Sequence, residues 1–206
     1  MVKVKICGLT TKKDIDIINK YRPDYIGFVF AESRRKVTPG IVREMTGALA
    51  AEIKKVGVFV NASAETVNEI SDICEIDIIQ LHGDETPYYC SLINKPIWKA
   101  VRVKDEKSLE NVQQYPVDTL LLDAYAADQY GGVGRTFDWE LVSKIGADRR
   151  IILAGGLNNG NVEAAISLVH PYCVDVSSGV ETDGRKDEAK IKEFLEKVRF
   201  GGFEDE

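Results

Sequence analysis

The sequence lacks a long apolar run, an apolar leader and an excess of positive charge, and each absence excludes a class of protein. No apolar stretch approaches the ~20 residues that a membrane-spanning helix needs, and the first residues enter an alternating segment instead of a signal peptide. The 33 Asp and Glu residues outnumber 27 Lys and Arg, which gives a net charge of −6. This balance argues against a general binder of nucleic acid or anionic membranes, but it allows a local basic pocket for a small anion.

Cysteine and histidine are also scarce, with four cysteines and two histidines in 206 residues. Cys7, Cys74, Cys90 and Cys173 lie far apart, without a CxxC pair or a histidine at metal-ligand spacing. With no signal peptide, reduced thiols in the cytoplasm are expected in place of disulfides. The pattern gives no support to a structural zinc site.

Eight short apolar runs rich in β-branched residues recur at intervals of roughly 20 to 32 residues, which is typical of a repeated supersecondary unit. These predicted strands are Val2–Ile6, Asp24–Phe30, Lys55–Val60, Asp77–Leu81, Ile97–Val103, Thr119–Leu122, Ile151–Ala154 and Cys173–Val176. The segments between them read as amphipathic helices, of which Pro87–Asn94 has the weakest pattern. Predicted N-caps are Thr38, Ser63, Asp138 and Asn158, and Asp187 precedes a helical apolar stripe that runs from Ile191 to Val198.

Strand then helix, eight times over, predicts a parallel sheet covered by helices. The count favours an α/β fold of one domain, a closed (β/α)₈ TIM barrel. We expect residues 1–200 to form the barrel and residues 201–206 to form a polar tail. The length is near the lower limit for this fold and leaves no room for a second domain.

The first strand carries polar side chains on one side only. Lys3, Lys5 and Cys7 alternate with Val2, Val4 and Ile6, so they face the barrel axis if the valines face the helices. The last strand has the same pattern, with Asp175 facing inward. Because the first and last strands are neighbours in a closed barrel, Lys5 and Asp175 are predicted to pair, since an unpaired buried lysine would be costly.

Polar residues gather where the strands end, which is the face of this fold that carries chemistry. The seventh and eighth strands end in "LAGGLNN" and "DVSSGVE", and the loops at these two positions often bind phosphate in barrels. Glycines let the backbone approach an anion, and amides at a helix N-terminus point at it. These stretches could otherwise be tight turns, but their position together favours a phosphate site.

Cys7 and Asp123 stand at the same predicted rim, at the ends of the first and sixth strands. A lone cysteine is usually a buried apolar residue and a lone aspartate often caps a loop, but the rim position and the lysine below Cys7 favour a reactive thiol with a lowered pKa. His82 follows the fourth strand and could orient a ligand or cap a loop. The glycine-rich segment after Asp123, "YGGVG", is interpreted as a lid, because it lacks the lysine and spacing of a P-loop.

Taken in order, several motifs resemble the phosphoribosylanthranilate isomerase family over nearly the whole chain, from Val2 to Phe194. They are "KICGLT", "IGFVF", "VGVFVN", "QLHGDE", "LLDA" with "YGGVGRTFDW", "LAGGLN" and "VDVSSGVETDGRKD". The resemblance implies an Amadori rearrangement of N-(5-phosphoribosyl)anthranilate, an aminoaldose, to its 1-deoxyribulose isomer in tryptophan biosynthesis. It implies a small phosphorylated substrate and no metal or organic cofactor. Val133 and Arg135 depart from the family's usual lid residues.

The resemblance also assigns roles to residues. Cys7 is implied as the general base and Asp123 as the general acid, which suits two groups facing each other across a barrel mouth. The remaining implied ligands are Arg35 (or its neighbour Arg34) for the anthranilate carboxylate, Gln80, His82 and Asp175 for the rest of the substrate, and Gly155, Gly156, Ser178 and Gly179 for the phosphate.

Two other readings remain open from the sequence: a different phosphosugar barrel, such as a ribulose-phosphate epimerase or a thiamine-phosphate synthase, and a non-catalytic phosphate-ligand binder. An epimerase would want several histidine and carboxylate metal ligands at the rim, and the presence of both Cys7 and Asp123 argues against a non-catalytic binder. A nucleic-acid or membrane partner is not expected. The chain is expected to be a monomer or a homodimer.

Overall fold

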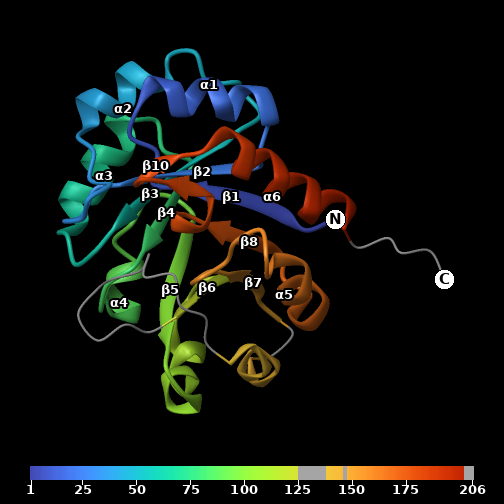
Figure 1. Ribbon diagram of the computed structural model, residues 1–206. Helices are drawn as coiled ribbons and strands as arrows, with labels where there is room; N and C mark the ends of the chain where they lie inside the picture. Colours follow the sequence, from blue (N-terminus) through green and yellow to red (C-terminus); the bar gives the residue numbers. More distant parts are fainter. Residues whose placement is uncertain (125–137, 146–147, 202–206) are drawn as a thin grey trace.

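Eight parallel strands close into a barrel in the computed structural model, which describes residues 1–124, 138–145 and 148–201 (Figure 1). The strands follow one another around the barrel in chain order, and β1 closes it against β8. Their bounds are β1 Lys3–Cys7, β2 Tyr25–Val29, β3 Lys54–Phe59, β4 Ile78–Leu81, β5 Ile97–Val103, β6 Thr119–Ala124, β7 Arg150–Leu153 and β8 Cys173–Val176. The predicted barrel is confirmed, and the predicted strands agree with the observed ones to within two residues at each end.

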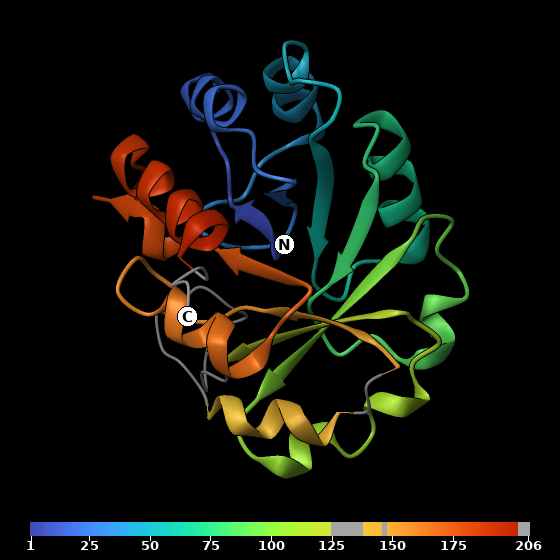
Figure 2. The same ribbon diagram turned by 90° about the vertical axis from the view of Figure 1, so that its right-hand side faces the viewer.

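Helices cover the outside of the barrel (Figures 1 and 2). They are α1 Lys12–Tyr21, α2 Pro39–Thr46, α3 Ala64–Ile73, α4 Pro87–Cys90, α5 Val162–Val169 and α6 Glu188–Phe200. Thr38 and Ser63 accept hydrogen bonds from backbone N–H groups at the helix starts, as predicted, and Asp187 caps α6 in the same way. The predicted cap at Asn158 is wrong: α5 begins after Asn161, because the Asn158 side chain accepts from Gly160 N–H in a preceding turn.

The connections after β5 and β6 differ from the expected amphipathic helices. In the described residues they contain short 3₁₀ segments: η1 (Glu106–Leu109), η2 (Val112–Gln114) and η3 (Trp139–Lys144). Asp138 caps η3, accepting from Glu140 N–H. From these segments, Leu109, Val112 and Val142 pack with Leu120 and Leu122 of β6. Short apolar turns therefore cover this part of the barrel, where a longer helix was expected.

A small hairpin after β8 was not predicted. A short 3₁₀ turn, η4 (Ser178–Val180), leads into β9 (Glu181–Thr182), which pairs antiparallel with β10 (Arg185–Lys186). The linking residues Asp183 and Gly184 both have positive φ, 51° and 75°. Asp-Gly is a strong signal for a two-residue hairpin turn. The hairpin folds Glu181 and Lys186 into the protein, with only 8% of each residue exposed.

The barrel interior changes character along its axis. Toward the amino ends of the strands, Tyr25, Val56, Trp98, Leu121 and Ile152 belong to one buried apolar cluster. Above it lies the predicted pair, with Lys5 Nζ 2.8 Å from Asp175 Oδ2 and Lys5 fully buried. Apolar side chains therefore fill the interior near the amino ends of the strands, and polar side chains occupy it near the carboxyl ends.

Candidate active site

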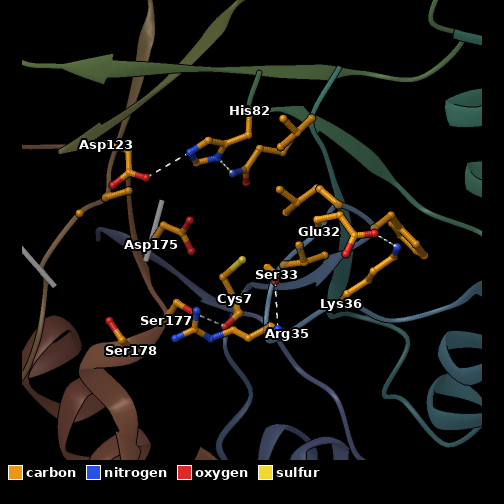
Figure 3. A pocket seen from close by; sticks show the side chains of 18 of the residues that line it. Cys7, Glu32, Ser33, Arg35, Lys36, His82, Asp123, Asp175, Ser177 and Ser178 are labelled. Carbon is orange, nitrogen blue, oxygen red and sulfur yellow. Dashed lines mark hydrogen bonds and ion pairs between the residues drawn. The ribbon is translucent and has the colours of Figure 1, made fainter. Parts of the chain in front are cut away.

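A cavity of about 510 Å³ opens at the carboxyl ends of the strands (Figure 3). It is lined by nine of the ten site residues expected from the sequence, namely Cys7, Arg35, Gln80, His82, Asp123, Gly155, Gly156, Asp175 and Ser178. The tenth, Gly179, lies behind the wall of the cavity. The lower wall is apolar, with Val58 and Ala154 among the lining residues.

Cys7 ends β1 with its sulfur directed into the cavity (Figure 3). Space for the thiol comes from Gly27 of β2, since a Cβ at Gly27 would lie 2.6 Å from Cys7 Sγ. The sequence alone did not indicate that Gly27 belongs to the site, although Gly27 stands beside Cys7 in the register of two neighbouring strands. Ser177 Oγ donates to the Cys7 carbonyl at 3.0 Å, which ties the end of β1 to the end of β8.

The pKa of the Cys7 thiol lies above its ordinary value, and the predicted lowering is wrong. Burial raises this pKa, and the charge of Asp175 raises it further; the charges of Lys5 and Lys186 and a hydrogen bond from Lys5 act in the opposite direction but do not offset burial. The sequence showed the lysine but not how completely the thiol is enclosed. A thiolate formed here is a stronger base than an exposed one, because basicity rises with pKa.

Lys5 stays charged although it is fully buried. Burial alone would lower the pKa of Lys5, but the charges of Asp175 and Cys7 and its hydrogen bonds to them hold that pKa above its ordinary value. Asp175 uses only Oδ2 in this pair, and its buried Oδ1 has no hydrogen-bond partner among the described residues. Asp175 lines the cavity, so Oδ1 is a candidate ligand for a substrate hydroxyl.

Asp123 faces Cys7 from another side of the cavity, at the end of β6 (Figure 3). His82 Nε2 lies 3.1 Å from Asp123 Oδ2, and Gln80 Nε2 lies 2.8 Å from His82 Nδ1. If the Gln80 amide donates, His82 must carry its proton on Nε2 and donate to Asp123. The chain of contacts holds the carboxyl in one orientation and leaves Oδ1 free of His82.

The loop after β7 makes room for that carboxyl. A Cβ at Gly155 would lie 2.7 Å from Asp123 Oδ1 and 2.4 Å from the Ala124 backbone nitrogen, and its φ of +79° also favours glycine. Gly156, with φ of +69°, follows at the cavity wall. Gly155 therefore makes room for the carboxyl group, and both glycines line the candidate anion site.

The β7 and β8 loops meet closely on the side of the cavity that we predicted to hold phosphate. Gly155, Gly156 and Ser178 line the cavity there. Gly179 does not reach it, and its role is to let the loops approach, since a Cβ would lie 1.9 Å from the Leu157 carbonyl oxygen. The loops thus form one continuous wall with glycine, serine and backbone amide groups.

The structure separates Arg34 from Arg35. Arg35 lines the cavity and has an 11% exposed side chain, whereas the Arg34 side chain is 57% exposed and lies outside the cavity lining. Both guanidinium groups contact Glu181, a residue that was not predicted from the sequence to belong to the site. The signal for it was the Asp183-Gly184 pair, which is typical of a two-residue hairpin turn.

The expected lid with Gly131, Gly132 and Gly134 lies outside the described residues, as do Val133, Arg135 and most of the expected tail. All four cysteines are free thiols and buried. Within the described ranges no cluster of three or more His, Cys, Asp or Glu side chains suits a metal ion, and no helix is long and apolar enough to cross a bilayer.

Comparison with known proteins agrees with this geometry. Residues 4–197 match the family described as N-(5'phosphoribosyl)anthranilate (PRA) isomerase. A protein of that name from Acetivibrio thermocellus is 53% identical, over 97% of this chain and 96% of its own length. One from Thermoanaerobacter pseudethanolicus is 48% identical, over 97% and 98%.

Solved structures show the same relationship. The phosphoribosyl anthranilate isomerase of Thermotoga maritima superposes with a TM-score of 0.88 at 37% identity, covering 97% of this chain and 99% of that one. A second structure is of a phosphoribosyl anthranilate isomerase in complex with reduced 1-(o-carboxyphenylamino)-1-deoxyribulose 5-phosphate. It has a TM-score of 0.85 and 36% identity, covering 97% of this chain and 99% of that one. A 3-hexulose-6-phosphate synthase from Salmonella typhimurium, 16% identical with a TM-score of 0.70, shares the fold alone.

Proposed function

Because the chain belongs to the N-(5'-phosphoribosyl)anthranilate isomerase family, we propose that Cys7 and Asp123 are the proton-transfer pair of its cavity. The chain is an isomerase that converts N-(5'-phosphoribosyl)anthranilate to 1-(2-carboxyphenylamino)-1-deoxyribulose 5-phosphate in tryptophan biosynthesis. The single observation that carries our assignment is that a thiol on β1 and a carboxyl on β6 face one cavity from different sides.

In the first step the acid opens the sugar ring. Asp123, in its protonated form, gives its proton to the furanose ring oxygen, and the C1–O bond breaks to leave an iminium ion at C1. His82 and Gln80 support this step by fixing the rotamer of the carboxyl group. The space left by Gly155 beside Oδ1 gives the substrate oxygen access to the proton.

In the second step the base removes the proton from C2 of the sugar. The Cys7 thiolate takes this proton, and the C–H electrons form the C1=C2 bond of an enolamine. The enolamine becomes the ketone when C1 gains a proton and the C2 hydroxyl loses one. Lys5 holds its positive charge next to the thiol and favours the thiolate. Each of the two proton transfers typically contributes ~10²–10⁴-fold to the rate.

The rest of the substrate can be placed from charge and hydrogen bonding. Arg35 binds the anthranilate carboxylate, a task suited to a guanidinium group. Asp175 Oδ1 accepts a hydrogen bond from a sugar hydroxyl, with Gln80 nearby in the same wall. The phosphate lies against Gly155, Gly156 and Ser178, while Gly179 brings their loops together.

The decisive experiment measures turnover and binding separately. We expect Cys7→Ala and Asp123→Asn each to lose most of the isomerase rate, followed by the loss of substrate fluorescence in a coupled assay, while both still bind the reduced product analogue. A Cys7→Ala variant with the full rate would show that another group is the base. A tryptophan auxotroph lacking this isomerase gives a parallel readout, because the wild-type chain should restore growth and the variants should not.

We also propose that the enzyme works in the cytoplasm, as its free buried thiols suggest. Cell fractionation of the native source, followed by the isomerase assay on each fraction, would test this; activity in a secreted fraction would contradict it. We further predict that the protein is a monomer or a homodimer. A molar mass measured by light scattering would show which of the two it is. The phosphoribosylanthranilate isomerase of Thermotoga maritima is dimeric, and a solved structure shows monomers generated from it.

A further inference from the structure

One buried carboxylate gathers three positive charges beside the cavity. Glu181 of the β9–β10 hairpin accepts from Arg34 Nη2 at 2.8 Å, from Arg35 Nε at 2.7 Å and Nη2 at 2.8 Å, and from Lys186 Nζ at 2.8 Å. Glu181 is 8% exposed and stands outside the cavity lining, whereas Arg35 is part of it. The carboxylate therefore holds Arg35 from behind.

The grip on Arg35 is directional. Glu181 takes the Nε and Nη2 edge of the guanidinium in a two-point contact, which fixes the plane of the group. Nη1 makes no hydrogen bond with any residue that the structure describes, so this edge is available to an incoming ligand. Gly8 makes room for the arm of the side chain, since a Cβ there would lie 2.3 Å from Arg35 Cδ.

The cluster around Glu181 holds more positive than negative side chains. Burial opposes ionisation of Glu181, but its contacts with Arg35 and Lys186 hold its pKa below the ordinary value, so one negative charge faces three positive ones. Lys186 is itself buried and also donates to the Ser177 carbonyl at 2.9 Å. A substrate that carries both a carboxylate and a phosphate would find complementary charge here.

We propose that Glu181 is a positioning residue that aims Arg35 at the carboxylate of the aromatic ring, and that it thereby sets the preference for substrates carrying that group. The inference rests on the role proposed above for Arg35. The hairpin that bears Glu181 and Lys186 then acts as a support for substrate recognition as well as a link between β8 and α6.

A purely structural role is the alternative, because Glu181 also joins the hairpin to the loop after β2. The two roles differ in what they do to ligands. Loss of a general support should weaken every ligand of the cavity alike. Loss of positioning should weaken only ligands that bear the ring carboxylate.

The test uses two probes with the complete chain: reduced 1-(o-carboxyphenylamino)-1-deoxyribulose 5-phosphate and the same compound without the ring carboxylate. Titration calorimetry gives Kd for each with the wild type, Glu181→Gln and Arg35→Gln. We expect Glu181→Gln to weaken the carboxylate probe about tenfold, as for loss of a charge-assisted hydrogen bond, and to leave the other probe nearly unchanged. The effect of Glu181→Gln should vanish when Arg35→Gln is already present.

Glu188→Gln is the matched control, because it removes the same charge from the start of α6, where Glu188 pairs with Lys20 outside the cavity. It should leave both Kd values unchanged. If Glu181→Gln does not fold, Glu181→Asp keeps the charge but shortens its reach, and it should reduce the preference for the carboxylate probe in the same direction.

The outcomes separate the inference from the proposed function. Equal weakening of both probes, or tighter binding of the carboxylate probe, by the Glu181 variant would overturn the positioning role. If Arg35→Gln discriminates between the probes and the Glu181 variant does not, the Arg35 assignment stands and only the inference fails. If Arg35→Gln treats both probes alike, the assignment of Arg35 to the carboxylate fails first.

Discussion

Two buried lysine–carboxylate pairs, Lys5–Asp175 and Lys99–Glu85, look alike in chemistry and differ in how completely they are satisfied. Lys99 of β5 lies 3.0 Å from Glu85 and also donates to the Gly83 carbonyl at 2.7 Å, and both side chains are 2% exposed. Glu85 further accepts from the backbone of Asn61 and Gly83. This second pair is closed, and it holds the loop that follows His82.

The pair inside the barrel is left open. Asp175 Oδ1 has no hydrogen-bond partner among the described residues, and the pair stands beside a thiol. A closed buried pair stabilises the fold only while both partners are present. Removal of one partner leaves the other charge buried, with neither a counter-charge nor water to solvate it. An open pair beside a cavity keeps a free oxygen and a charge for a ligand. The difference teaches that satisfaction of the partner atoms, more than burial, separates a supporting ion pair from a functional one.

The largest effect is expected from breaking the closed pair. Lys99→Met leaves the Glu85 carboxylate buried without its cation and should destabilise the fold by about 3–5 kcal/mol. Urea unfolding followed by circular dichroism measures this loss. The kcat of the molecules that remain folded should stay at the wild-type value. A stable variant with reduced kcat would reverse the roles assigned to the two pairs.

Breaking the open pair should act on the pH profile instead. In the proposed mechanism the thiolate is the reactive form of Cys7, so kcat/KM should rise with pH through the thiol pKa. Burial raises this pKa, so the rise should lie above the ordinary thiol range. Lys5 opposes this effect, so Lys5→Met should move the rise to still higher pH by about one to three units. At neutral pH, kcat/KM then falls by about tenfold for each unit by which the thiol pKa rises. The pH dependence of kcat/KM for both lysine variants tests this, and Lys99→Met should leave the profile where it is.

The space beside the open pair gives a third prediction. Gly27→Ala would place a Cβ 2.6 Å from Cys7 Sγ and force the thiol to move. Because small displacements of reacting groups are costly, kcat should fall by about tenfold to a hundredfold. Gly40→Ala on α2 is the control, since a Cβ there meets nothing within 4 Å. Steady-state kinetics should show no change for the control; an unchanged Gly27→Ala would mean that the thiol is not confined.

The smallest effect is expected at the far wall of the cavity. Ser178→Ala removes one neutral hydroxyl from the proposed phosphate site, so KM should rise by roughly twofold to tenfold with kcat unchanged. A substrate analogue without the phosphate should bind the wild type and the variant equally. If Ser178→Ala weakened that analogue as well, the hydroxyl would contact another part of the substrate.

Much of this molecule follows from local rules of sequence. The alternation in the first strand was enough to predict that Lys5 faces inward and meets Asp175, because a closed barrel makes the first and last strands neighbours. The cavity residues at the strand ends followed from the same register. These successes share one cause: the period of a strand fixes the direction of its side chains.

The features that could not be predicted depend on how deeply a side chain is buried and on short turns. The direction of the Cys7 pKa shift depends on how completely the thiol is enclosed, and no pattern in the chain measures that. Gly27 became relevant only when the register placed it opposite the sulfur. The hairpin that carries Glu181 was hidden in a short polar stretch, although its Asp-Gly pair was a readable signal. The turns after β5 and β6 were also beyond reach, since a single apolar turn has too few residues to show a period.

The contact between Lys5 and Asp175 spans 170 residues of chain, and the hairpin that supports Arg35 follows later still. Cys7 lies on β1 and Asp175 on β8, so a fragment without β8 would hold the thiol without the carboxylate partner of Lys5 and without the β8 side of the cavity. Because the proposed proton transfer needs these groups together, we expect such a fragment to be inactive toward the substrate.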